Sequence, residues 1–465
     1  MTLEETLAAR PTPGQPRGYT FPPFERVAMP SGLQVLTVHV PGRPLISANL
    51  VIRYGASDEP ADLAGATALA ARAMTEGTAR YPGVEVVEAA ERLGTTISVD
   101  AGWDSFMVGV EVTAARLRAA LELLDEVLRR PAFPAADVER LRDERLNDLL
   151  QLRAEPRRRV EWAFVETIYS PQSPYGRLLA GAETTVARLG RDELAAVHAA
   201  LLDPRRAALV VGGDLSGLDV PRLAEEMLGE FATGPGGGST VGAAEVEAPV
   251  TSAAVDRRVV RLLDRPDSVQ SEIRIGHVGL PRRNPDFHTV QVMGAILGGL
   301  FNSRLQRNLR EDKGYTYGIG AGFDMRRGAG PFSARTAVQT SVTVPAITEV
   351  LGELDRMRQT PVTQAELDVA RDYLVGVFPL RFEVPSAVVG AIGGLFALGL
   401  PDDELARYRG LVEAVDVAGV QKAAQDHIHT DRLAIVVVGD AAAVGKELEA
   451  AGFGEFELMT EEAAG

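Results

Sequence analysis

Two side chains in the segment from Leu297 to Phe323, LGGLFNSRLQRNLREDKGYTYGIGAGF, are of types that stabilise negative charge. Arg310 carries fixed N–H donors and keeps its proton at every accessible pH, and Tyr317 carries a phenol donor on a rigid ring. Donors of these kinds, placed where an oxyanion develops, lower the barrier to attack on a carbonyl carbon. The structural alternative is that Arg310 pairs with Glu311 or Asp312 and that Tyr317 packs at the start of a strand.

A second segment, Gly65 to Thr78 (GATALAARAMTEGT), has the spacing of a metal-binding helix without its ligands. Ala68, Ala71 and Arg72 stand at i, i+3 and i+4, which project from one face of a helix. A methyl group has no lone pair to give to zinc, and a guanidinium is a permanent cation with no acceptor. The segment therefore predicts a helix face that binds no metal.

Together the two segments resemble the pitrilysin/insulinase family of metallopeptidases, the inverzincins. In that family a glycine, the motif His-x-x-Glu-His and a Gly-Thr pair follow one another; the histidines bind zinc and the glutamate activates the zinc-bound water. Gly65, Gly77 and Thr78 match the framing residues. The family's three catalytic positions fall on the two alanines and the arginine described above, so the resemblance implies a degenerate zinc motif.

The resemblance also assigns a place to the third zinc ligand, a glutamate in the family. Its spacing falls on Asp148, 76 residues after Arg72, and the acid one heptad earlier falls on Leu141. Asp148 is then the remnant carboxylate, one methylene shorter than glutamate. We expect it either to form an ion pair with Arg72 or to lie on a solvated helix face.

The segment from Leu297 to Phe323 is similar to the part of the family that contains Gly-Gly, Ser-Arg-Leu and Leu-Arg-Glu-x-x-Gly-x-x-Tyr. The resemblance implies that Arg310 and Tyr317 grip the peptide carbonyl opposite the zinc and stabilise the tetrahedral intermediate. It also implies that Gly298 and Gly299 bind substrate. The matched positions are Gly298, Gly299, Ser303, Arg304, Leu305, Leu309, Arg310, Glu311, Gly314 and Tyr317.

The strand expected between Gly94 and Trp103 is where the family presents an Asn-Ala edge to its substrate. Ser98 and Val99 take those two places in this sequence. We expect them to be substrate-binding positions, because pairing through the backbone of an edge strand does not depend on the side chains.

The retained Arg/Tyr pair and the lost zinc motif resemble one chain of the bacterial two-chain peptidases of this family. The resemblance implies a heterodimer in which a homologous partner subunit holds the zinc, while this chain holds no cofactor and lends its donors in trans. The substrate would be a peptide or an unfolded polypeptide. The alternatives are a catalytically inert scaffold and a peptide-binding module with the same fold.

An internal repeat of about 226 residues divides the chain into two alike halves. ALVVGGD at 208–214 returns as AIVVVGD at 434–440, and each is an apolar run that predicts a buried strand. Helical stretches at 192–202 and 416–428 precede these strands, and long helices are expected after 132 and after 360. We also expect a half-buried strand at 105–112 followed by a helix capped by Thr113, and a helix from Pro60 or Asp62 to Gly77.

These elements indicate an α+β fold with two homologous α/β domains, each a mainly antiparallel sheet covered by helices. The resemblance implies that the domains face each other as half of a clamshell. TGPGGGST at Thr233–Thr240 predicts a flexible linker. The expected division is a tail at 1–20, an N-terminal domain at 21–232, a linker at 233–254 and a C-terminal domain at 255–465.

The composition of the 465 residues is that of a globular protein, with 46% hydrophobic and 24% charged residues. A formal net charge of -16 argues against nucleic acid as a partner. The absence of cysteine excludes thiolate metal sites and disulfides. The N-terminus has no apolar core typical of a secretory signal, and the apolar stretch 387–400 is too short to span a bilayer, so we expect a cytoplasmic protein without a membrane partner.

Other motifs give little support to other activities. Of the six histidines only His427 and His429 are close in sequence, and without a nearby cysteine or clustered acids they predict surface polarity rather than a metal site. The glycines and Lys446 after the strand near 434 have the wrong spacing for a phosphate-binding loop. GIGAGF at 318–323 is glycine-rich but follows no dinucleotide-binding unit.

Overall fold

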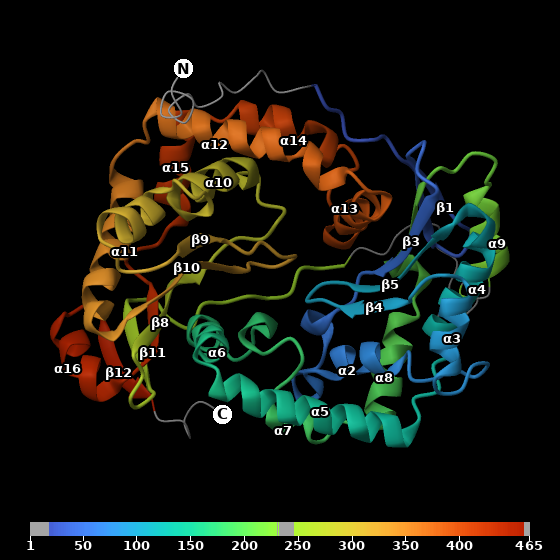
Figure 1. Cartoon of the computed structure of the whole chain (residues 1–465), viewed down its shortest axis with the longest axis horizontal. Coiled ribbons are helices and arrows are strands. Elements are labelled where there is room, and N and C mark those ends of the chain that lie inside the picture. Colours follow the sequence, from blue (N-terminus) through green and yellow to red (C-terminus); the bar gives the residue numbers. More distant parts are fainter. Residues whose placement is uncertain (1–17, 230, 232–245, 460–465) are drawn as a thin grey trace, which may run out of the picture.

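The computed structural model describes residues 18–229, 231 and 246–459. The glycine-rich stretch Thr233–Thr240 and residues 1–17 of the expected tail lie outside this range. The described residues form two mixed sheets of six strands each, with helices on both faces, one sheet in each half of the chain (Figure 1). The predicted α+β fold with two alike halves is confirmed.

The sheet of the N-terminal half has the strand order β1-β2-β6-β3-β5-β4. β2 and β6 pair in parallel and the other neighbours pair antiparallel. The strands are β1 (Glu25–Ala28), β2 (Gln34–His39), β3 (Leu45–Ile52), β4 (Ser98–Ala101), β5 (Phe106–Thr113) and β6 (Ala207–Gly213).

The sheet of the C-terminal half has the order β12-β7-β11-β8-β10-β9. β7 pairs in parallel with both β11 and β12, and the remaining pairs are antiparallel. The strands are β7 (Val259–Asp264), β8 (Gln270–Val278), β9 (Ile319–Phe323), β10 (Pro331–Gln339), β11 (Ala434–Gly439) and β12 (Glu455–Met459). The repeated apolar runs are thus the central strands β6 and β11, buried along their whole length.

The α-helices are divided between the two halves. In the N-terminal half they are α2 (Ala66–Ala73), α3 (Glu85–Arg92), α4 (Leu117–Arg129), α5 (Ala135–Ala154), α6 (Pro156–Ile168), α7 (Glu183–Val186), α8 (Arg191–Leu201) and α9 (Val220–Leu228). In the C-terminal half they are α10 (Phe287–Gly294), α11 (Thr343–Gln359), α12 (Gln364–Val377), α13 (Pro385–Leu398), α14 (Glu404–Glu413), α15 (Val417–His427) and α16 (Ala441–Ala450). Two π-helical turns, Ala295–Gly299 and Gln306–Asp312, follow α10.

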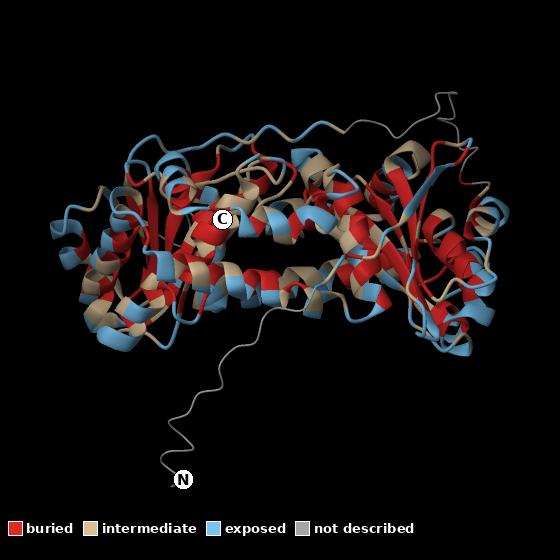
Figure 2. Cartoon of the chain, turned by 90° about the horizontal axis from the view of Figure 1, so that it is seen from above, coloured by how far each residue is buried: buried red, intermediate tan, exposed pale blue. Residues whose placement is uncertain are grey.

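Each half gives one helix to the sheet of the other half. α6 packs on β8 and β11, and α13 packs on β3 and β6. Figure 1 shows α6 beside β8 and α13 beside β3. A sheet glycine permits each approach: a Cβ on Gly276 would lie 2.9 Å from the Phe164 ring, and one on Gly212 would lie 2.6 Å from a methyl of Val389. Figure 2 shows the buried residues of the two sheets gathered toward the two ends of an elongated molecule.

Two hairpin tips join the halves through buried polar contacts. Asp104, between β4 and β5, accepts a hydrogen bond from the backbone N–H of Arg327, between β9 and β10, at 2.9 Å. The Arg327 guanidinium donates to Asp58 at 2.9 Å, and its side chain is 5% exposed. Tyr175 donates to Asp104 at 2.7 Å. Because a buried charge is costly unless it is paired, this network holds the halves in one arrangement.

Several local expectations need correction. α2 begins at Ala66 rather than near Pro60, because Gly65 takes a left-handed conformation (φ +97°) and the residues before it form a separate turn. The same helix ends at Ala73, before Gly77. Thr113 makes no side-chain cap, and a short 3₁₀ turn separates it from α4.

The segments at the expected boundaries make specific contacts. Tyr19, in the expected tail, stacks on Phe382 with ring centroids 6.5 Å apart. Ser252, in the expected linker, accepts a backbone hydrogen bond from Ser170 at 2.9 Å. The domain limits themselves stay a prediction. Among the described residues no single helix has the length and apolar character to cross a membrane; one pair, 364–382 and 385–398, passes this test jointly but is bent by 112°.

Candidate functional site

The N-terminus of α2 is held by hydrogen bonds within the chain. The buried carboxylate of Glu59 accepts hydrogen bonds from the backbone N–H groups of Gly65, at 3.0 Å, and of Thr67. Burial raises the pKa of Glu59. A Cβ on Gly65 would lie 2.8 Å from the backbone of Ala180, so the framing glycine is required by close packing as well as by its positive φ.

The face of α2 at the family's zinc positions is occupied by packing and by an ion pair. Ala71 is buried and Ala68 is half-buried. Arg72 is exposed and donates to Glu144 of α5 at 2.7 Å. Glu144 also accepts from Arg140 at 2.8 Å, and these hydrogen bonds lower the pKa of Glu144. No group on this face can ligate zinc, so the residues present do not fit the metal that the family implies.

Asp148 lies one turn further along α5 and has other partners. It accepts hydrogen bonds from Arg158 at 3.2 Å and from Arg145. These arginines lower the pKa of Asp148, and the hydrogen bond from Arg158 is the largest cause. The predicted ion pair between Arg72 and Asp148 is therefore wrong: the helical periodicity of α5 places Glu144, not Asp148, opposite Arg72.

The strand β4 is the edge of the first sheet, where the sequence placed Ser98 and Val99. Ser98 is exposed and Val99 is half-buried against the core. Their backbone partners on β5 are Gly109 and Val108, which leaves the other side of β4 without a neighbouring strand among the described residues. This arrangement can accept an added strand. Their role in substrate binding stays a prediction.

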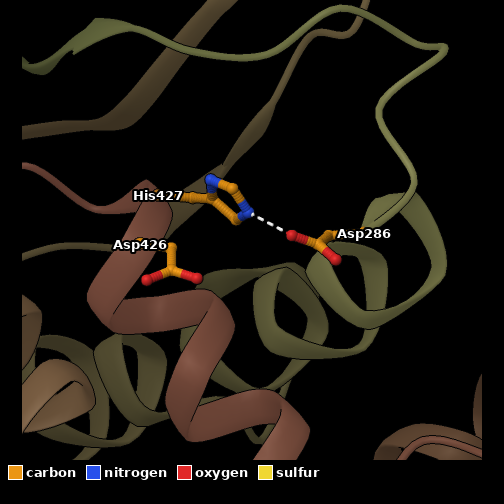
Figure 3. A group of neighbouring side chains, drawn as sticks. All are labelled: Asp286, Asp426 and His427. Atoms are coloured by element: carbon orange, nitrogen blue, oxygen red, sulfur yellow. Dashed lines mark hydrogen bonds and ion pairs between the residues drawn. The ribbon is translucent and has the colours of Figure 1, made fainter.

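A group that could ligate a cation lies at the end of α15. Asp286, Asp426 and His427 offer ligand atoms within 4.8 Å of one another (Figure 3). His427 Nε2 is 2.7 Å from a carboxylate oxygen of Asp286, and Lys422 donates to Asp426. With an ammonium group already on one carboxylate, the trio is satisfied as an ion-pair cluster. His429 is not among these ligand atoms, and its backbone N–H donates to His277 at 3.1 Å.

The two glycines that open the matched C-terminal segment have different surroundings. Gly298 is buried in the first π-helical turn, and a Cβ there would lie 2.4 Å from the backbone nitrogen of Ala321 in β9. Gly298 therefore allows the turn and the strand to pack closely against each other. Gly299 is exposed. Only Gly299 is open to a ligand, and a substrate-binding role for it stays a prediction.

The segment is anchored below these glycines by Arg304. Its guanidinium donates two hydrogen bonds to Glu366 of α12, from Nε at 2.7 Å and from Nη2 at 3.1 Å. Thr363 caps the same helix and donates to the same carboxylate at 2.9 Å. The Arg304 hydrogen bond is the main cause that lowers the pKa of Glu366 to about 2. The bidentate geometry fixes the segment on the helical layer.

Arg310 lies on the second π-helical turn and reaches the surface. Its guanidinium stacks on the ring of Phe301, 4.4 Å from the centroid. Nε lies 3.7 Å from a carboxylate oxygen of Glu311, a loose contact, and about a third of the side chain (34%) stays exposed. The structural alternative is thus only partly met, because Phe301, itself 69% exposed, holds the arginine more closely than the acid does.

Tyr317 is 96% exposed, the largest value among the exposed large hydrophobic side chains that the structure describes. Its hydroxyl has no hydrogen-bond partner within the described part of the chain. The alternative that Tyr317 packs at the start of β9 is wrong. A tyrosine that covers nothing within its own chain is available to contact another molecule.

Sequence reasoning missed a cavity of about 370 Å³ beside this segment. It lies on the face of the second sheet that also carries α6, and its lining includes Arg157, Arg274 and Arg335. These residues come from α6, β8 and β10, which are far apart in sequence. The one local signal was GIGAGF, whose alternate glycines line the same cavity at Gly318 and Gly320.

Two family models match the chain. The model described as insulinase (peptidase family M16) matches residues 34–182, and the model described as peptidase M16 inactive domain matches residues 188–374. The two matches include both segments described above.

Individual relatives are distant but similar over most of their length. A protein named as an uncharacterized zinc protease of Mycobacterium leprae is 23% identical over 374 residues, 79% of this chain and 81% of that protein. A protein named as a non-peptidase homolog of Helicobacter pylori is 23% identical over 359 residues, 77% of this chain and 80% of that protein.

Two solved structures share the fold. A peptidase M16 inactive domain from Pseudomonas fluorescens superposes with a TM-score of 0.81 at 23% identity, covering 90% of this chain and 98% of its own. A protease from Helicobacter pylori superposes with a TM-score of 0.80 at 16% identity, covering 90% of this chain and 100% of its own. At these identities the structures establish the common architecture.

Proposed function

This chain belongs to the insulinase family of peptidases, family M16, and from that premise we propose that it is a zinc-free subunit of a two-chain peptidase. In this proposal a homologous partner subunit holds the zinc. This chain binds the peptide and supplies Arg310 and Tyr317 as donors to the reacting carbonyl. The names of a relative, a non-peptidase homolog, and of the matching inactive domain accord with a chain that is not a peptidase by itself.

The first support is the chemistry of α2. Ala68 and Ala71 have no ligand atom, and Arg72 is tied to Glu144 at 2.7 Å. Asp148, at the third-ligand position, is already paired with two arginines. A metal brought to this face would meet methyl groups, a guanidinium and carboxylates already paired with arginines, so we expect no activated water here.

The observation that carries the proposal is the exposure of Tyr317, 96%, next to a segment that is otherwise firmly anchored. Arg304 and Gly298 fix the segment from below, through two hydrogen bonds to Glu366 and through contact with β9. Donors on a rigid support lose little freedom when they bind, and that is the condition for stabilising a transition state.

Within the assembled enzyme the roles divide by residue type. Zinc bound in the partner would supply the activated water. In this chain the Arg310 guanidinium and the Tyr317 hydroxyl would donate hydrogen bonds to the carbonyl oxygen as it gains negative charge.

The partners and the location follow from the same proposal. The substrate is a peptide or an unfolded polypeptide that reaches an edge strand, and the net charge of -16 leaves nucleic acid outside the substrate class. The cofactor is the partner's zinc alone. The cytoplasmic location expected from the sequence remains part of this proposal.

The test mixes this chain with a homologue that carries an intact His-x-x-Glu-His motif and follows cleavage of a quenched fluorescent peptide. Arg310→Gln and Tyr317→Phe are each expected to lower kcat by about 100-fold to 1000-fold, the usual loss for one donor to an oxyanion. Tyr373→Phe is the matched control, because Tyr373 of α12 is 51% exposed and lies outside the segment.

Assembly is measured separately by light scattering, so that a lost activity is not confused with a lost complex. Unchanged turnover in both variants, with the complex intact, would leave an inert scaffold as the function. Cleavage by this chain alone, at a rate that survives a chelator and rigorous removal of other peptidases, would contradict the division between the two subunits.

A further inference from the structure

The glycines of GIGAGF lie on the face of the second sheet that looks toward α6. In the register of the sheet Gly320 stands opposite Arg335, and Arg335 stands opposite Arg274 on its other side. Directly paired residues of an antiparallel sheet share one face. Two arginines and a glycine therefore form a row across β8, β10 and the edge strand β9.

The glycine leaves room for the arginine beside it. A Cβ built on Gly320 would lie 3.7 Å from Nε of Arg335, so this side chain leans over the edge strand. A Cβ on Gly322 would meet nothing within 4 Å. Since neither position carries a side chain, the outer strand forms an open floor beneath the guanidinium.

The cavity above this floor has a volume of about 370 Å³ and is lined by three arginines and one glutamate. Arg157 comes from the first turn of α6, and the only acid in the lining is Glu272. The chain as a whole has a formal net charge of -16, whereas the side chains that line this cavity carry an excess of positive charge. The local field favours an anion.

The cations of the cavity are only partly neutralised by the protein. Arg274, 3% exposed, donates to Glu161 at 2.7 Å and approaches Glu272 at 3.4 Å. Arg157 and Arg335 have no side-chain hydrogen bond or ion pair in the part of the chain that the structure describes. Gln306 also lines the cavity, and its buried carbonyl oxygen has no partner there.

We propose that this arginine cavity binds a carboxylate of the peptide, carried either by an acidic side chain or by the peptide C-terminus. The inference rests on the proposed peptide binding by this chain. Gly318 of the cavity lining adjoins Tyr317, so a peptide held at Tyr317 can place a carboxylate over the glycine floor. There a guanidinium can grip the carboxylate through two hydrogen bonds.

The position of the cavity connects it to the proposed site. Gly318, which lines the cavity, directly follows Tyr317, and Gln306 begins the π-helical turn that carries Arg310. One bound peptide can therefore reach both places. The cavity would make the chain selective for peptides that carry an acid a few residues from the group held at Tyr317.

The experiment measures binding of four fluorescent decapeptides to the full-length chain by anisotropy at low ionic strength. The peptides combine a central Glu or Gln with a free or an amidated C-terminus. We expect at least one carboxylate to tighten binding by about tenfold, equivalent to ~1.4 kcal/mol. Arg335→Gln should abolish this preference, and high salt should weaken it. Comparing the four peptides shows which carboxylate is recognised.

Arg191→Gln is the matched control, since Arg191 is an exposed arginine at the start of α8, outside the cavity. It should keep the preference, and circular dichroism should show both variants folded. Equal binding of all four peptides to the wild type, or a preference that survives Arg335→Gln, overturns the proposal. So does binding of inorganic phosphate, followed by calorimetry, without any preference among the peptides.

The outcome is separable from that of the proposed function. A lost preference in Arg335→Gln together with full turnover in the two-chain assay supports the carboxylate site and leaves the donors untouched. Peptides that bind without charge preference, while Tyr317→Phe still lowers turnover, overturn the carboxylate site alone.

Discussion

The two segments that match the family differ in whether their polar side chains have partners within the chain or are exposed to solvent. On α2 the side chains are engaged within the chain: Ala71 is buried and Arg72 reaches Glu144 at 2.7 Å. On the segment from Gly298 to Tyr317 the support is engaged, with Arg304 paired to Glu366. Tyr317 is 96% exposed, and Arg310, stacked on Phe301, is 34% exposed. The difference teaches that a helix without metal ligands can be fully engaged within its own half, whereas the side chain of Tyr317 on its anchored support is left open to solvent.

The ion pair between Arg304 and Glu366, which anchors the segment, gives the largest expected effect on stability. Glu366 has a folded-state pKa of about 2, below the 4.5 of an unperturbed group, so its contribution is complete above pH 4.5 and is lost as the pH falls toward 2. Arg304→Gln should therefore lower the free energy of unfolding by roughly 2 to 3 kcal/mol at pH 7, less than the whole shift because Thr363 also donates to this carboxylate, and by much less at pH 3. Denaturant unfolding followed by circular dichroism at both pH values measures the difference.

Arg307→Gln serves as the control for the anchor. Arg307 lies on the same segment and is exposed, and its side chain makes no hydrogen bond or ion pair with the described residues. An equal loss in Arg307→Gln, or a loss in Arg304→Gln that is the same at pH 3 as at pH 7, would mean that the segment is not held by the pair with Glu366.

A smaller effect is expected from the close approach of the segment to β9. Gly298→Ala places a Cβ 2.4 Å from the backbone nitrogen of Ala321, so the strand has to move. We expect a loss of about 2 kcal/mol in the free energy of unfolding, typical of an overpacked interior. Gly294→Ala, where a Cβ meets nothing within 4 Å, should not lose stability. Equal stability of the two variants would show that the turn can shift freely.

The smallest effect is expected on α2. Arg72→Gln removes an exposed ion pair, and Glu144 keeps its hydrogen bond from Arg140 at 2.8 Å. We expect the midpoint of thermal unfolding to shift by about 1 °C or less, as for most surface pairs. Turnover of the two-chain complex should not change. A large fall in turnover with the fold intact would break the comparison, because it would make the α2 face functional.

Much of the architecture can be read from local pattern. The apolar runs at 208–214 and 434–440 predicted the central strands of both sheets, and the alternation of Phe106, Val108 and Val110 predicted β5. The apolar stretch 387–400 lies largely in α13, although its composition alone left a buried helix and a packed loop both open. Helix ends were predicted less well, because Gly65 begins α2 through a left-handed conformation and a contact with Ala180 that no local rule reveals.

The sequence by itself determined which atoms are available: no zinc ligand at residues 68, 71 and 72, and a guanidinium and a phenol at residues 310 and 317. Only the tertiary structure decided which atoms meet. In the structure Arg72 pairs with Glu144, and α6 and α13 each pack on the sheet of the opposite half of the chain. The same packing brings Arg157, Arg274 and Arg335 together around one cavity. The physical reason is that periodicity reports whether a residue is buried, whereas its partner depends on how distant elements pack and on the register between strands.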